Sequence, residues 1–70
     1  MFTLEDMRLT SDGRRVSDGF YGGRHTKYRD MIVINPFPKY AYGFTTEEDA
    51  QKTADFYNKR GYNFVVRNRQ

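Results

Sequence analysis

The apolar positions in the middle of the chain predict two consecutive strands. Residues 28–35 contain the most apolar run of the sequence, residues 31–34. A short unbroken run of this kind is typical of a strand buried on both faces, so we expect a central strand. Pro36 should end it, because proline has no N–H for the ladder. Residues 40–44 alternate large and small side chains, with three rings on one face, which predicts a second strand paired with the first.

The stretch after this hairpin predicts the helix of the fold, at about residues 46–60. Thr46 with Asp49, or Thr45 with Glu48, has the spacing of a capping box, in which a hydroxyl accepts from a backbone N–H of the first turn. The first turn is acidic and the last turn is basic, as the helix dipole favours. Mostly small side chains form the inward stripe: Ala50, Thr53, Ala54 and Tyr57.

Gly61 predicts how this helix ends. A glycine just past the last turn adopts the left-handed conformation without steric cost, and the residue after it then contacts the last turn. We therefore expect Tyr62 to contact Tyr57. Residues 62–67 form the closing strand, whose two faces alternate. Tyr62, Phe64 and Val66 share the face that is favoured as the core, and Asn63, Val65 and Arg67 share the other.

The first third of the chain is organised by two Ser-Asp-Gly turn signals. The first, residues 11–13, predicts a hairpin in which Leu9 lies across from Val16. The second opens a glycine-rich stretch, residues 19–23, which we expect to be a mobile loop. The alternative for the beginning of the chain is a helical turn that starts at residues 4–7.

These elements predict a single small α+β domain, residues 1–70. The expected order is β-β-β-β-α-β, in an antiparallel or mixed sheet of three to five strands with one helix packed across it. A chain this short buries only about 60% of its unfolded surface. It has no cysteine for a disulfide. Its stability then depends on packing, on a partner, or on a homodimer.

Composition favours a binding role in the cytoplasm. Six Phe and six Tyr exceed what so small a core needs, and aromatic residues are enriched in interfaces. The net charge of +3 permits a nucleic-acid partner without requiring one. No apolar run approaches the ~20 residues that cross a bilayer, and Glu5 and Asp6 stand where a signal peptide would be basic. We therefore expect a cytoplasmic protein without a membrane partner.

The sequence contains no constellation that predicts catalysis, a cofactor or a metal. His25 is the only histidine, and the carboxylates nearest to it in sequence are Asp18 and Asp30. A second histidine or a cysteine for a transition-metal site is absent. Residues 19–23 lack the Gly-Lys-Ser/Thr of a phosphate-binding loop, and helix capping accounts for the acidic run at 47–49. We expect a protein that is not an enzyme.

One segment resembles a nucleic-acid-binding motif. Residues 60–67 are similar to the RNP1 segment of RNA-recognition motifs, which runs basic, Gly, aromatic, Gly or Ala, aromatic, Val, any residue, aromatic. Residues 32–35 loosely resemble RNP2. The chain departs from the pattern at Asn63 and at Arg67. That family also places RNP1 on its third strand, before a second helix, so the functional roles of its residues are not carried over.

Two hypotheses about function follow. The first is a non-catalytic protein-binding module that inhibits or regulates a larger machine. In size and character such a chain resembles phage host-takeover proteins and anti-CRISPR inhibitors. The candidate partner-binding residues are Phe20, Tyr21, Arg24, Phe37 and Tyr40. The alternative is direct binding of RNA or single-stranded DNA by stacking on rings and by phosphate contacts. Its candidate residues are Arg14, Arg15, Arg24, Lys27, Arg67 and Arg69.

Overall fold

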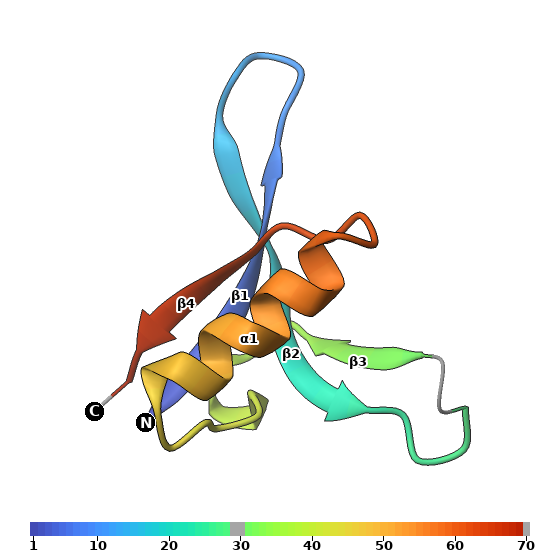
Figure 1. The fold of residues 1–70 in the computed structure, drawn as a ribbon. Coiled ribbons are helices and arrows are strands. Elements are labelled where there is room, and N and C mark those ends of the chain that lie inside the picture. Colours follow the sequence, from blue (N-terminus) through green and yellow to red (C-terminus); the bar gives the residue numbers. More distant parts are fainter. Residues whose placement is uncertain (29–30, 70) are drawn as a thin grey trace.

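The computed structural model describes residues 1–28 and 31–69, and it confirms the expected fold class. Four antiparallel strands form one sheet in the order β3-β2-β1-β4, and the single helix of the described residues packs across it (Figure 1). The elements follow one another as β1 Phe2–Leu9, β2 Arg15–Arg24, β3 Ile32–Asn35, the 3-10 turn η1 Pro38–Tyr40, α1 Glu47–Asn58 and β4 Phe64–Asn68.

The predicted hairpin between the first two strands is present, with a register one residue away from the expected one. Leu9 pairs with Arg15 instead of Val16. Gly13 adopts a positive φ of 86°, and its N–H donates to the carbonyl of Thr10 over 3.0 Å. Such a turn followed by a left-handed residue is a common three-residue hairpin loop. The alternative of a helical turn near the start is wrong, because residues 2–9 are extended.

The glycine-rich stretch is a strand, which corrects the expectation of a mobile loop. Residues 19–23 lie within β2, which pairs with β1 through its first part and with β3 through its last part. Gly19 has a φ of 121°, beside an irregularity in the pairing with β1. A Cβ at Gly19 would lie 2.8 Å from a methyl carbon of Ile34. The glycine therefore permits a close approach of two strands.

The apolar run forms an edge strand, so the expectation of a central strand is wrong. β3 begins at Ile32, and its sequence neighbours at 29–30 lie outside the described residues. It pairs only with β2, its side chains are half-buried, and Met31 just before it is exposed. An apolar run indicates that a segment prefers burial, but it does not indicate how many strands pair with it. As expected, the strand ends before Pro36.

The prediction of a strand at residues 40–44 paired with the apolar run is wrong, because β3 pairs with β2 and this stretch makes only isolated β contacts. A single bridge joins Phe44 to Phe2, and the N–H of Tyr42 donates to the carbonyl of Tyr21 over 2.8 Å. Phe2 already pairs with β4 on its other side, and Tyr21 pairs with β3 on its other side. Residues 42–44 therefore lie between β1 and β2, at the point where β2 leaves β1.

The helix follows the local signals closely. The hydroxyl of Thr46 accepts from the N–H of Asp49 over 3.1 Å, so the capping pair is Thr46 with Asp49 and not Thr45 with Glu48. Gly61 has a φ of 106°, and the N–H of Tyr62 reaches the carbonyl of Tyr57 over 3.3 Å. The predicted contact between those two rings is present, with centroids 5.9 Å apart. The regular helix ends at residue 58, two residues before the expected end.

The core lies between α1 and the β1–β4 part of the sheet. Leu4, Ala50 and Ala54 are fully buried, and Phe64 is 5% exposed. Alanine methyl groups let the helix approach the sheet closely, as the small inward stripe predicted. On β4 the face of Phe64 is the core face, where Tyr62 and Val66 are half-buried against the cluster.

Asn58 joins the end of the helix to the edge of the sheet. Its side-chain nitrogen donates to the carbonyl of Phe64 over 3.1 Å, and its side-chain oxygen accepts from the N–H of the same residue over 2.7 Å. β4 is an edge strand, and this amide satisfies both backbone groups of Phe64. The side chain thus stands where a neighbouring strand would bond.

Candidate functional site

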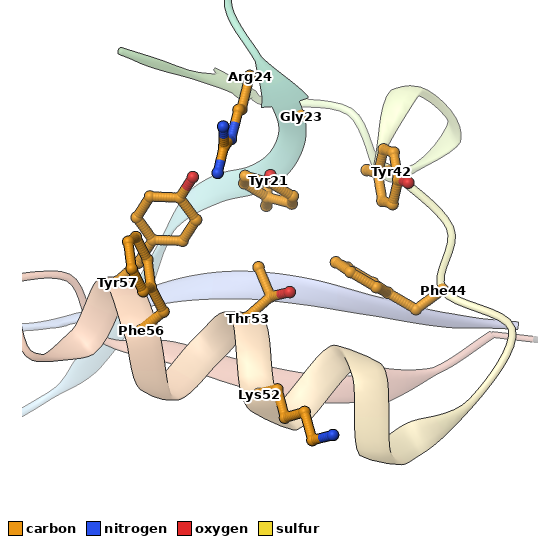
Figure 2. A pocket seen from close by; sticks show the side chains of 9 residues that line it. All are labelled: Tyr21, Gly23, Arg24, Tyr42, Phe44, Lys52, Thr53, Phe56 and Tyr57. Atoms are coloured by element: carbon orange, nitrogen blue, oxygen red, sulfur yellow. The ribbon is translucent and has the colours of Figure 1, made fainter. Parts of the chain in front are cut away.

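A cleft of about 550 Å³ opens between α1 and the last part of β2 (Figure 2). The helix packs mainly against β1 and β4, so the last part of β2 extends away from the helix (Figure 1). Residues 42–44 form the end of the cleft beside β1 (Figure 2). Five rings line it: Tyr21, Tyr42, Phe44, Phe56 and Tyr57. A volume of this size lies within the range of roughly 300–1,000 Å³ that is usual for ligand pockets.

Tyr21 is the central ring of this cluster. Its centroid lies 5.8 Å from that of Tyr42, 6.0 Å from Phe44 and 5.6 Å from Tyr57. These are the separations that favourable aromatic pairs prefer. Burial, and then hydrogen bonding with Tyr57, raises the pKa of Tyr21 to about 12, while the nearby charge of Arg24 acts in the opposite direction. The cleft is therefore built on a neutral, rigid aromatic base.

Two rings at the rim of the cleft are open to solvent. Tyr42 is 50% exposed and Phe56 is 45% exposed. The guanidinium carbon of Arg60 lies 3.8 Å from the Phe56 ring centroid, and Arg60 also donates to the Phe56 carbonyl over 2.8 Å. The Phe56 ring is thus held in position at the surface, where a ligand can reach it.

The charged side chains that line the cleft are both cationic. Figure 2 shows Arg24 on the strand side and Lys52 on the helix side. Lys52 pairs with Glu48 one turn earlier, over 3.2 Å, and both of these side chains are well exposed. Among the described residues no carboxylate lines the cleft. The arrangement suits a ligand that combines an aromatic or apolar group with negative charge.

A second pair of exposed rings lies on the connection before the cleft. Phe37 is 58% exposed and Tyr40 is 57% exposed, and their rings pack edge to face with centroids 6.4 Å apart. The ammonium of Lys39 lies 4.9 Å from the Tyr40 centroid. These two predicted partner-binding residues are therefore accessible. Pro36 and Pro38 bracket Phe37 and stiffen the segment.

The other two predicted partner-binding rings are core residues, which corrects the loop interpretation. Phe20 and Tyr21 are each 6% exposed and lie in β2. Tyr21 faces the helix, and Phe20 faces the opposite side of the sheet, where the guanidinium carbon of Arg69 lies 5.2 Å from its ring centroid. The glycines on either side of this pair suggested a loop, but the segment is part of the strand β2. The fifth candidate, Arg24, is exposed and lines the cleft.

The structure does not gather the six predicted nucleic-acid residues into one surface. Arg14 and Arg15 lie at the tip of the β1–β2 hairpin, Arg67 and Arg69 at the opposite end of the sheet, and Lys27 in the connection after β2 (Figure 1). Two of them are engaged in ion pairs, each with an N–O distance of 3.0 Å. Arg14 pairs with Asp12 and Arg67 pairs with Glu5. Arg24 alone lines the cleft.

His25 has a local structural role. Its Nδ1 accepts from the N–H of Lys27 over 3.1 Å and from that of Tyr28 over 3.2 Å. Asp18, a carboxylate considered as its partner, pairs instead with Arg8 over 3.0 Å. The other, Asp30, lies outside the described residues. Within residues 1–28 and 31–69 no three potential ligands cluster as a metal would require.

Of the nine residues that line the cleft, only Tyr21 and Arg24 were candidate binding residues in the sequence, and the other seven include Tyr42, Lys52, Phe56 and Tyr57. One signal was present in the helix. Phe56 and Tyr57 are consecutive, and neighbours in an α-helix point about 100° apart, so both rings cannot face the same core. The exposed ring of such a pair marks a surface. Tyr42 and Lys52 carried no comparable signal.

In comparisons with protein-family models, curated proteins and solved structures, nothing matches this chain. In the part of the chain that the structure describes, no helix has the length and apolar character needed to cross a membrane.

Proposed function

We propose that this protein is a non-catalytic protein-binding module that inhibits or regulates a larger assembly. Its binding surface is the set of four exposed rings on the connection before α1 and on α1 itself, called here the aromatic surface: Phe37, Tyr40, Tyr42 and Phe56. The observation that carries the proposal is that each of these rings is about half exposed in a chain whose core contains few large side chains.

Energetics support a role for these rings in binding. Aromatic side chains bury roughly 150–250 Å² each, and a few of them usually dominate the free energy of an interface. Phe37 is held between two prolines and against Tyr40, so it loses little conformational entropy when it docks. A stiff, exposed ring is an efficient contact for a protein partner.

Charge distribution favours a protein over a nucleic acid as the first candidate. The basic residues lie at separate corners of the fold, and two of them are neutralised by neighbours. The first turn of α1 carries Glu47, Glu48 and Asp49, which would repel a phosphate backbone that continued past the cleft. A protein partner can present its negative charge at chosen points.

One observation supports RNA or single-stranded DNA as a second candidate. Three exposed rings each have a cation over them: Lys27 at 5.5 Å from Tyr28, Lys39 at 4.9 Å from Tyr40, and Arg60 at 3.8 Å from Phe56. A ring on which a base can stack, next to a cation that can contact a phosphate, is what binders of single strands use. This candidate requires the rings to act with their own cations.

Site-specific photo-crosslinking tests the proposal. A photoreactive residue replaces Phe37 in one variant and Leu9 in a control, because Leu9 is an equally exposed apolar residue at the distant hairpin. In lysate of the native cells we expect one protein to be crosslinked from position 37 and not from position 9. Mass spectrometry then identifies it. Equal labelling from both positions would contradict a specific aromatic surface.

A fluorescence-anisotropy titration with single-stranded oligonucleotides separates the two candidates. For a protein-binding module we expect no micromolar binding of the oligonucleotides at about 50 mM salt. Tight binding that collapses at about 200 mM salt would indicate phosphate contacts and would favour the second candidate.

A further inference from the structure

We propose that the cleft between α1 and β2 holds one acidic segment of the protein partner. A single aromatic or large apolar side chain of that segment enters between the rings, and carboxylates on either side of it pair with Arg24 and Lys52. This inference rests on the proposed function, since it assumes that the partner is a protein. It assigns a ligand chemistry to the cleft, which shares Tyr42 and Phe56 with the aromatic surface.

The walls of the cleft fit an inserted ring. Tyr42 and Phe56 stand on opposite sides and are about half exposed, while Tyr21 and Phe44 form a buried base (Figure 2). The resident rings pack with centroids 4.8–6.0 Å apart across Tyr42, Phe44, Tyr21 and Tyr57. One more ring in the open space can adopt the same edge-to-face geometry with several of them. The volume of about 550 Å³ also leaves room for the adjacent backbone of the segment.

The two cations fit carboxylates that flank this ring. Arg24 and Lys52 lie on opposite sides of the cleft, and the ammonium of Lys52 is directed away from the rings (Figure 2). A central group can therefore have one carboxylate beside Arg24 and a second farther out, at the rim on the helix side. The guanidinium of Arg24 can hold a carboxylate through two parallel hydrogen bonds. Lys52 now pairs with Glu48, but an exposed ion pair of this kind contributes little, and a ligand carboxylate can replace it.

A short acidic segment fits this charge pattern better than a nucleic-acid strand. The ligand needs negative charge at two points only. The acidic first turn of α1 lies one helical turn before Lys52. A peptide can end its acidic run there, whereas a strand carries one phosphate per nucleotide. Aspartate and glutamate next to a Phe or Trp are therefore the expected recognition pattern.

NMR titration of the folded, full-length protein tests the inference. The probe is the acetylated and amidated peptide Glu-Asp-Phe-Asp-Glu. We expect saturable shifts of the backbone amides of Gly23, Arg24, Tyr42 and Thr53, with a Kd in the millimolar range or tighter. Replacing the central Phe of the peptide by Ala, or its four acids by Lys, should weaken binding at least tenfold, because each change removes one half of the recognition.

Charge reversal in the protein supplies the matched control. Arg24→Glu and Lys52→Glu each change an exposed side chain in the cleft, so the fold should be retained, and each should weaken peptide binding at least tenfold. Arg14→Glu makes the same change in net charge at the distant hairpin tip and should leave the Kd unchanged. Equal weakening by all three variants would indicate only long-range attraction and would overturn the inference.

Several other outcomes would also overturn it. One is the absence of shifts in the cleft at several millimolar peptide, and another is equal binding of the Ala or Lys peptides. Binding of a thymidine oligonucleotide in the cleft in place of the acidic peptide would assign the cleft to nucleic acid. In each case a specific crosslink from position 37 would still support the proposed function, so the two failures are distinguishable.

Discussion

The helix side of the sheet has two halves that are covered in different ways. Over β1 and β4 the helix packs closely, and Ala50 and Ala54 join Leu4 in a cluster without exposed surface. Over the last part of β2 there is no helix among the described residues, and rings such as Tyr42 stand around an open cleft. Small side chains bring a helix onto one half, and large side chains at the boundary keep the other half open.

In this chain of 70 residues one face of the sheet serves both for stability and for binding, and the two halves divide these roles. The covered half removes apolar surface from water within the chain itself, which provides stability. The open half keeps apolar surface for a partner. Substitutions in the covered half should therefore change mainly stability, and substitutions in the open half mainly binding.

The largest effect is expected in the covered half. Leu4→Ala removes a fully buried side chain and should lower the free energy of unfolding by about 2–5 kcal/mol, because it leaves a cavity under the helix. Urea denaturation measures this. The same substitution at Leu9, which is 68% exposed, should change stability by less than about 0.5 kcal/mol. Similar losses at both positions would show that the core is not where the structure places it.

A smaller effect is expected where the helix joins the edge strand. Asn58→Ala removes both hydrogen bonds to the backbone of Phe64 and should cost about 1–2 kcal/mol, since each such bond contributes about 1 kcal/mol. Hydrogen exchange of the Phe64 amide should become faster at the same time. Asn63→Ala, an exposed asparagine in the same connection, provides the control and should change neither quantity.

Tyr21 stands at the boundary of the two halves and links stability to alkaline pH. Its pKa is raised from 10.0 to about 12, so the folded state keeps a proton that the unfolded state loses. Stability is complete below pH 10 and falls as the pH rises through 12, by about 1–2 kcal/mol. Tyr21→Phe should remove this fall. Denaturation at several pH values between 7 and 12 measures the difference, and equally steep falls in the two proteins would contradict it.

The smallest effect on stability is expected in the open half. Phe56→Ala removes a ring that is 45% exposed and should lower the free energy of unfolding by less than about 1 kcal/mol. Binding of the acidic peptide should nevertheless weaken at least tenfold. Phe64→Ala, in the covered half, should show a large loss of stability, about 3–5 kcal/mol. A Phe56→Ala variant that binds normally would remove this ring from the site.

Local signals predicted the elements that depend on local physics. The capping of α1 by Thr46, the left-handed Gly61 and the contact of Tyr62 with Tyr57 each involve groups within a few residues of one another, so the sequence contains their causes. The hairpin at Gly13 belongs to the same class. Its register was off by one residue, because the loop contains three residues: Thr10 bonds to Arg14 across it, which places Leu9 opposite Arg15.

The errors concern features that depend on distant neighbours. Whether the apolar run becomes a central or an edge strand is decided by which strands lie beside it. Gly19 permits a close approach to Ile34, and Gly22 to Val33, which is visible only once β3 is in place. The cleft itself exists because β2 leaves β1 and residues 42–44 fill the gap, a geometry that no local pattern records. Only the consecutive rings at positions 56 and 57 indicated that one of them must be exposed.

The side-chain amide of Asn58 also affects whether further copies of the chain can pair with the sheet at β4. In an antiparallel strand successive residues direct their backbone groups alternately to the two sides, so Phe64 directs its groups to the free edge of β4. An edge with unsatisfied groups is a template on which further chains add as new strands, the first step towards fibrils. With that position occupied by a side chain, growth of the sheet from this edge must first break two hydrogen bonds. A homodimer, if it forms, is therefore not expected to pair through β4, and a chain that displays so many rings is protected there from stacking into an extended sheet.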